Sequence, residues 1–134
     1  MKISTRGRYA VRIMAELAKN YGTLLSSAEL CEKQDISPKY AEKILALLKK
    51  ANLIKSEKGA TGGYTLSSDA KEINVAQILK ATDDLPELVP CIENKTNCPR
   101  KMQCDSVGCW EKLNSLIVEY LSKLTLFDLI NKNY

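Results

Sequence analysis

Four cysteines near the C-terminal end of the chain are the residues best suited to chemistry. Cys91, Cys98, Cys104 and Cys109 follow the spacing C-x6-C-x5-C-x4-C within nineteen residues. In a reducing compartment, such a group is more often a metal or redox site than a disulfide framework. Structural zinc usually takes tight C-x2-4-C pairs, which this segment lacks. The wider spacings favour a loop around an iron–sulfur cluster, with a zinc loop or redox-switching thiols as alternatives.

Most catalytic chemistry is excluded by what the sequence lacks. The chain has no histidine, so Ser-His-Asp and Cys-His arrangements are impossible. It also lacks a phosphate-cradling P-loop and a dinucleotide-binding fingerprint. The fifth cysteine, Cys31, stands in an apolar pattern and is expected to be a small buried side chain. We therefore predict that the protein is not an enzyme.

The first half of the chain predicts three helices and a hairpin. Apolar residues at helical spacing indicate helices over 6–20 and 27–34. Ser37 and Pro38 open a third helix that runs to about Ala51, because serine suits the N-cap and proline the first helical position. Strands are expected at 53–56 and 64–66, around a segment with glycine at three of seven positions.

The second half predicts a short helix, the cysteine loop and a long helix. The short helix covers 75–81 with Asn74 as its cap, and the long helix covers 107–123. Thr125 is expected to cap a last short helix. The long helix carries apolar residues at near-heptad spacing and is predicted to be the contact between two subunits of a dimer. The alternative is that it packs against the N-terminal helices and hairpin of its own chain. The residues of the predicted dimer contact are Trp110, Leu113, Ile117, Tyr120 and Leu124.

These elements predict a mainly α fold with a small β-hairpin wing. We expect a winged helix-turn-helix DNA-binding domain at 1–82, a cysteine-rich cluster-binding loop at 83–106, and a dimerisation helix with the C-terminal tail at 107–134. The length of 134 residues and a hydrophobic fraction of 45% suit one small core. There is no apolar run of the ~20 residues that a membrane span needs and no signal peptide, so we expect a cytoplasmic protein.

The charge distribution favours DNA as the partner of the first half. Residues 1–58 contain 12 Lys and Arg against 6 Asp and Glu. The start of the third helix presents long polar side chains that can reach base edges, and the glycine-rich hairpin can approach the DNA backbone closely. A basic helix alone is usually just a solvated face, but the order of elements supports the DNA interpretation. The candidate DNA-binding residues are Arg6, Arg8, Ser37, Lys39, Tyr40, Glu42, Lys43, Lys58 and Thr61.

Three motifs make the chain resemble a known family. They are the opening KISTRGRYA, the ISPKY turn at 36–40 and the GGY of the hairpin at 62–64. With the cysteine loop and the long last helix, they resemble the IscR-type (Rrf2) regulators over nearly the whole chain. The resemblance implies a homodimer joined through the long helix and bound to double-stranded DNA at a palindromic operator. It also implies that DNA is recognised by Lys39, Tyr40 and Glu42 of the third helix and by Lys58 of the wing.

The resemblance further implies an iron–sulfur cluster held by Cys91, Cys98 and Cys104. The type expected first is 2Fe–2S, with 4Fe–4S second. The fourth ligand departs from the family pattern, because Val107 stands where IscR has histidine and Arg8 where other relatives have an acidic residue. Cys109 is the substitute we predict. If helix began by Asp105, however, Cys104 and Cys109 would point about 140° apart, whereas Gly108 permits a later start.

Together these features predict a transcription regulator, a repressor by preference, that senses iron–sulfur status or redox and nitrosative stress through its loop. The alternative is a winged-helix regulator without a cluster, controlled by thiol oxidation, zinc, or a partner protein or metabolite, as in the CymR branch. An electron carrier would have no use for the basic helix and wing. DNA retention in a gel-shift assay separates a regulator from a carrier.

Overall fold

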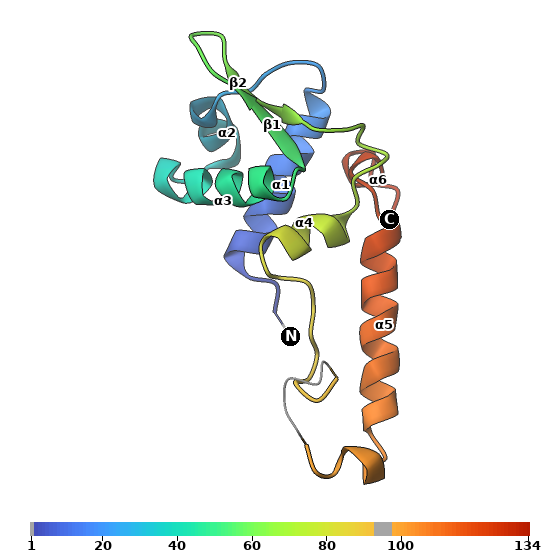
Figure 1. Ribbon diagram of the computed structural model, residues 1–134. Helices are drawn as coiled ribbons and strands as arrows, with labels where there is room; N and C mark the ends of the chain where they lie inside the picture. Colours follow the sequence, from blue (N-terminus) through green and yellow to red (C-terminus); the bar gives the residue numbers. More distant parts are fainter. Residues whose placement is uncertain (1, 93–97) are drawn as a thin grey trace.

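The computed structural model describes residues 2–92 and 98–134, and it places a helical bundle beside a two-stranded hairpin (Figure 1). Residues 93–97 of the predicted cysteine loop lie outside the described residues. The elements are α1 (Thr5–Lys19), α2 (Ser27–Gln34), α3 (Pro38–Lys50), β1 (Ile54–Glu57), β2 (Gly63–Leu66), α4 (Val75–Ala81), the 3₁₀ turn η1 (Lys101–Gln103), α5 (Val107–Lys123) and α6 (Leu126–Ile130). The predicted mainly α fold with a hairpin wing is confirmed.

The helix starts follow from capping side chains. Ser37 accepts a hydrogen bond from the Tyr40 N–H at 3.3 Å, and Asn74 and Gln77 form a reciprocal capping box at the start of α4. α1 begins at Thr5, one residue earlier than predicted, because Ser4 is its N-cap and accepts from Gly7 N–H at 3.1 Å. These caps satisfy N–H groups that no helical carbonyl can reach.

The wing is joined to the chain between α1 and α2. In the antiparallel hairpin, Ile54 pairs with Leu66 and Glu57 with Gly63. Leu25 forms a bridge to Tyr64, with N···O distances of 3.0 and 2.7 Å. A Cβ on Gly63 would lie 2.6 Å from the Leu25 carbonyl oxygen, so only glycine permits this approach. The start of β2 is therefore fixed to the segment between α1 and α2.

The core is built around α1. Its buried side chains, among them Ile13 and Leu17, pack with the inner faces of α2, α3 and α4. Cys31 is part of this core, as predicted from its apolar surroundings. Leu126 of α6 is fully buried in the same core, although it is separated from α4 by the cysteine loop and α5. The C-terminal helix therefore completes the core of the winged half.

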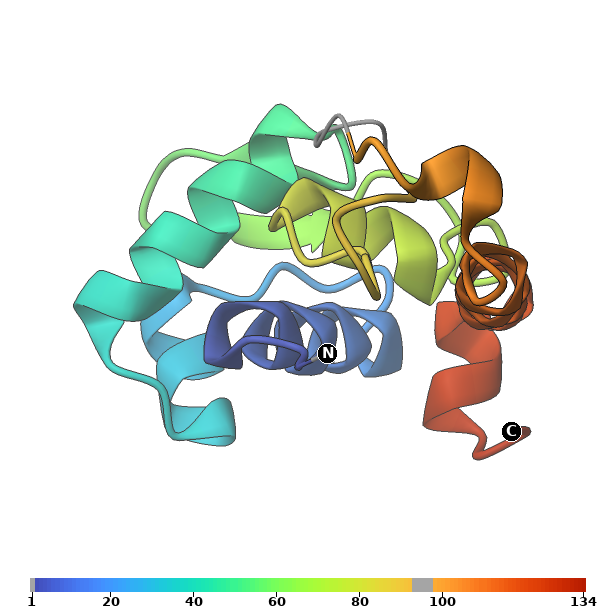
Figure 2. The ribbon, with the colours of Figure 1, turned by 90° about the horizontal axis from the view of Figure 1, so that it is seen from below.

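Helix α5 stands out from this body (Figures 1 and 2). It contacts α4, but none of its residues is buried. Its large apolar side chains Trp110, Leu113, Leu116 and Tyr120 are exposed. No helix among the described residues is long and apolar enough to cross a membrane. An apolar face of this size on one projecting helix suits contact with another protein surface.

The cap of α6 predicts a pH effect on stability. The Thr125 hydroxyl and backbone N–H donate to Asp128 at 2.8 and 3.1 Å and lower its pKa. Because the folded-state pKa is the lower one, the stabilisation is present above the unfolded value of about 3.9 and is lost as pH falls through the folded value. We expect Asp128→Asn to lower Tm clearly at pH 6 and progressively less as the pH falls below about 4. A Tm difference that stays constant from pH 3 to 7 would contradict this account.

Candidate nucleic-acid interface and cysteine loop

The start of α3 presents most of the side chains predicted to read DNA. Lys39, Glu42 and Lys43 are exposed there. Ser37 caps the helix, and the half-buried Tyr40 packs edge-on against Tyr9 of α1, with ring centroids 5.7 Å apart. Ser37, Lys39, Tyr40 and Lys43 line one hollow at this helix end. The structure thus brings together a hydroxyl, a phenol and two ammonium groups, all of which can donate to phosphate or base acceptors.

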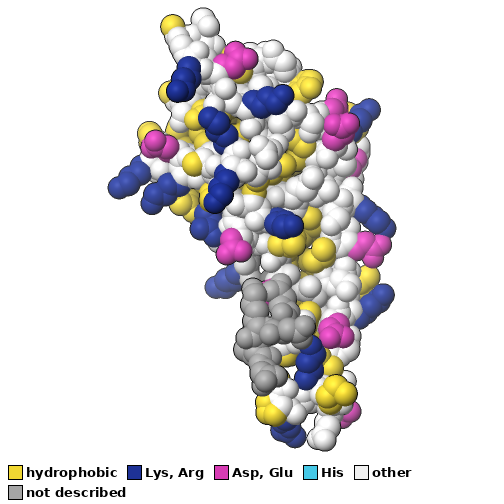
Figure 3. Space-filling view, viewed as in Figure 1, with side chains coloured by type: hydrophobic (Ala, Val, Ile, Leu, Met, Phe, Trp, Pro, Cys, Tyr) yellow, Lys and Arg dark blue, Asp and Glu magenta, His cyan; other side chains and the backbone are white. Residues whose placement is uncertain are grey.

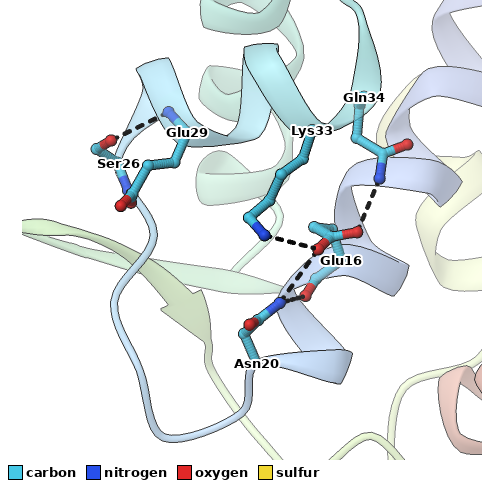
Figure 4. Close-up of polar contacts among 6 residues, drawn as sticks. All are labelled: Glu16, Asn20, Ser26, Glu29, Lys33 and Gln34. Atoms are coloured by element: carbon cyan, nitrogen blue, oxygen red, sulfur yellow. Dashed lines mark hydrogen bonds and ion pairs between the residues drawn. The ribbon is translucent and has the colours of Figure 1, made fainter.

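A polar network on the back of the helix-turn-helix fixes α2 against α1 (Figure 4). Glu16 of α1 accepts from Gln34 Nε2 at 2.9 Å and lies 3.8 Å from the Lys33 ammonium. Arg12 donates to the Gln34 side chain at 3.0 Å and to its backbone carbonyl, and its guanidinium lies 4.9 Å from the Tyr9 ring centroid. These contacts fix α1 and α2 relative to each other, and both helices pack against α3. The side chains at the start of α3 that are predicted to contact DNA are therefore held in a defined position.

The remaining predicted DNA contacts lie on different parts of the surface. Lys58 and Thr61 are exposed on the wing, and Lys and Arg side chains gather over α3 and the hairpin (Figure 3). Arg6 is half-buried beside α3 and lines a hollow with Tyr40 and Lys43. Arg8 is exposed elsewhere, in a hollow lined by α1, α4 and Leu121 of α5. Arg6 therefore extends the α3 surface, whereas Arg8 does not.

The cysteine loop presents free thiols. Cys91 is half-buried, while Cys98, Cys104 and Cys109 are exposed. The Ser106 hydroxyl, 3.3 Å from the sulfur of Cys104, and the N–H groups of Ser106 and Val107 lower the pKa of that thiol. A lowered pKa favours the thiolate, which is the form that binds metal. The donor chemistry therefore suits an iron–sulfur cluster.

The described residues do not hold these thiols in a finished site. Among residues 2–92 and 98–134, no three Cys, Asp or Glu side chains are grouped closely enough to hold a metal ion. Binding of a cluster by several of these cysteines therefore requires parts of the loop to move together. The thiols of the loop are suitable ligands for an iron–sulfur cluster, but the described residues are not arranged around one.

The start of α5 bears on the choice of a fourth ligand. The helix begins at Val107, with Ser106 as its N-cap. Cys104 precedes the helix, and its own backbone is extended. Cys104 and Cys109 therefore do not share one helix, and the opposition of about 140° expected for a start at Asp105 does not arise. The late start leaves Cys109 eligible as a ligand.

A contact that sequence reasoning missed joins the start of the loop to the start of α1. Asp84 accepts a hydrogen bond from Ser4 N–H at 3.0 Å and another from the Ser4 hydroxyl. A Cβ on Gly7 would lie 2.6 Å from Asp84 Oδ2, so a glycine in the first turn of α1 makes room for the carboxylate. We call this contact the Ser4–Asp84 link. One feature of the sequence is consistent with this contact. The first turn of α1 has no acidic residue of its own, so a carboxylate from elsewhere can interact with the positive end of the helix.

The predicted dimer residues divide into two groups on α5. Trp110, Leu113 and Tyr120 are exposed, whereas Ile117 and Leu124 are half-buried within the chain. Leu116, which the near-heptad spacing does not include, is 49% exposed and adds to the outer apolar face. The exposed apolar face of α5 therefore overlaps the predicted dimer contact at Trp110, Leu113 and Tyr120 and extends to Leu116.

Comparison with known proteins gives consistent matches over the full length. The Rrf2 family model, described as iron-dependent transcriptional regulator, matches residues 3–132. A Neisseria meningitidis protein provisionally described as an HTH-type transcriptional regulator is 37% identical over 98% of this chain and 89% of its own length. The HTH-type transcriptional regulator IscR of Vibrio vulnificus is 33% identical over 99% of this chain and 79% of its own.

Solved structures match as well. The global cysteine regulator CymR of B. subtilis has a TM-score of 0.78 at 32% identity and covers 98% of both chains. IscR of T. potens has the same TM-score and identity and covers 100% of this chain and 89% of its own. The two structures represent a cysteine regulator and an IscR protein, and the backbone is equally similar to both.

Proposed function

Since this chain belongs to the Rrf2 family, and is therefore a DNA-binding transcription regulator rather than an enzyme, we propose that an iron–sulfur cluster in its cysteine loop controls its binding to DNA. The observation that carries this proposal is the set of free loop cysteines, three of them exposed, one with a lowered pKa. Cys91, Cys98 and Cys104 would hold the cluster, with Cys109 as fourth ligand. By resemblance to IscR, 2Fe–2S is the first choice of type and 4Fe–4S the second.

The cluster would supply a centre that oxygen, peroxide or nitric oxide can oxidise or remove. The protein would translate its presence into a change of position. Because the described cysteines are not already grouped, gathering them pulls on both ends of the loop. One end is the Ser4–Asp84 link to α1, and the other is the start of α5. Both ends lead to elements that set the position of α3.

The active form in this proposal is a homodimer on a palindromic operator, and repression is the expected sign of regulation. The exposed apolar side chains of α5 would pack against their copies, which would place two α3 helices on one side of the assembly. A change in the start of α5 then changes the distance between the two reading helices. DNA affinity is sensitive to this distance, because operator half-sites have fixed spacing.

A second candidate is a regulator of the same fold controlled by thiol oxidation, zinc, or a partner protein or metabolite instead of a cluster. The equal similarity to CymR and the exposed Cys104 thiol with its lowered pKa support it. A thiol of this kind reacts readily with oxidants, because the thiolate is the reactive form.

The deciding experiment is the absorption spectrum of protein purified without oxygen, with iron and acid-labile sulfide measured on the same sample. We expect a brown protein with visible bands and about equal amounts of iron and sulfide, since clusters of either type contain both in equal number. A protein that is colourless and free of iron, even after anaerobic reconstitution, would reject the cluster and leave the second candidate.

A further inference from the structure

Three neighbouring hollows follow one another along one flank of α3 and share lining residues. The first, of 300 Å³, lies at the helix start between Ser37 and Lys43. The second, of 760 Å³, shares Tyr40 and Lys43 with it and is closed by the first residues of α1. The third, of 510 Å³, shares Leu47 and Lys50 with the second and ends at Lys80 of α4. We call this feature the α3 trench; α1 and α4 lie beside α3 along it (Figure 2).

The charged side chains along the α3 trench are all positive. None of the described residues that line it is acidic. Its floor is formed by small and apolar side chains such as Ala46 and Leu47. Cations from three different helices along a hollow reinforce one another and produce a positive potential along its length. The five cations are Arg6, Lys39, Lys43, Lys50 and Lys80.

One of these cations has an unpaired donor within the described part of the chain. Arg6 Nε is buried and has no hydrogen-bond partner among the described residues. A buried donor left unpaired is costly, so an acceptor supplied from outside would stabilise it. The start of α1 beside it already has a carboxylate, because Asp84 accepts hydrogen bonds from Ser4. The donor left for an outside anion in the middle of the trench is therefore Arg6 Nε.

We propose that the α3 trench binds the sugar-phosphate backbone of duplex DNA beyond the bases that α3 reads. The spacing of the cations fits a polyanion better than a small ion. Lys39 and Lys50 are separated by about 16 Å of helix, which is long enough to span several phosphates of one DNA strand, since these follow one another every ~3.4 Å along the duplex axis and further apart along the winding strand. The trench then continues to Lys80. This inference rests on the DNA-binding function and adds α4 and the end of α3 to the surface that contacts DNA.

The test is the salt dependence of binding to a fluorescent 40-base-pair duplex of mixed sequence, measured by anisotropy with the full chain. Removing one lysine that pairs with a phosphate should reduce the slope of log K against log salt by about 0.9 per subunit. We expect this reduction for Lys50→Gln and for Lys80→Gln. Lys49→Gln is the matched control, because Lys49 is exposed on the same turn of α3 but does not line the trench. We expect the control to keep the wild-type slope.

The outcomes separate this inference from the function on which it rests. If wild type binds the duplex and Lys50→Gln and Lys80→Gln have the slope of Lys49→Gln, the trench does not hold the DNA backbone. If wild type binds no duplex, the DNA-binding function itself is wrong and the inference falls with it. Titration of labelled protein with inorganic phosphate, followed by the Arg6 Nε–H resonance, tests a free anion. A saturable shift together with unchanged DNA slopes would assign the trench to a small anion and overturn the proposal.

Discussion

A variant with serine at Cys91, Cys98 and Cys104 is expected to contain no iron or acid-labile sulfide after anaerobic purification. Serine removes the thiolates that would ligate the irons, and its hydroxyl is not ionised near neutral pH. The loss should be complete, because the variant keeps only Cys109 of the four proposed ligands, and one thiolate does not retain a cluster that needs several. The variant should still fold, since none of the three side chains belongs to the hydrophobic core.

The same variant should bind DNA identically in air and under anaerobic reduction, whereas wild type should not. Cys31→Ala is the control, because Cys31 lies in the hydrophobic core and should not affect iron content. Cys109→Ser examines the fourth ligand and should lower the cluster content without abolishing it. A triple variant that still responds to air would place the sensor outside these cysteines.

A second large effect is expected from Leu126→Ala, which should cost about 2–5 kcal/mol of unfolding free energy. Leu126 is fully buried in the core formed by α1 and its neighbours. Its backbone N–H also donates to Ile73 at 2.8 Å, next to the bond from Val75 N–H to the Leu124 carbonyl at 2.9 Å. Since small domains are stable by only about 5–15 kcal/mol, this single truncation removes a large fraction.

The measurement is chemical denaturation at one fixed protein concentration, because the stability of the proposed dimer would depend on concentration. Leu126→Met is the control: it keeps the volume and should cost less than about 1.5 kcal/mol. If Leu126→Ala costs under about 1 kcal/mol, α6 is not part of the cooperative core.

Elements with local signals were predicted closely from the sequence. The Ser37-Pro38 start of α3, the Asn74 cap of α4 and the bounds of α5 agree with the structure because capping and helical periodicity act within one or two turns. β1 lies one residue later than predicted and β2 begins one residue earlier, because pairing between the two strands sets their ends. η1 was not predicted, since a single 3₁₀ turn leaves little pattern.

Features made by distant segments could not be predicted in this way. Ser4 and Asp84 are 80 residues apart, and no spacing rule links them. The α3 trench combines side chains from three helices, so Lys50 and Lys80 show no local signal that distinguishes them from other surface lysines. The prediction that Arg8 contacts DNA came from the basic charge of residues 1–58, which does not reveal that Arg8 lies in a hollow lined with residues of α4 and α5.

The Ser4–Asp84 link has a thermodynamic consequence. The carboxylate belongs to the loop that would hold the cluster, and the serine begins the helix that supports α3 and carries Arg6. If this contact couples the two sites, the coupling must be reciprocal, because the free energy of a cycle does not depend on its direction. If the cluster changes the affinity of the protein for DNA by some factor, DNA must change the affinity of the protein for the cluster by the same factor. The equilibrium occupancy of the cluster site should therefore differ between operator-bound and free protein, so promoters would take part in setting how readily their own regulator is loaded.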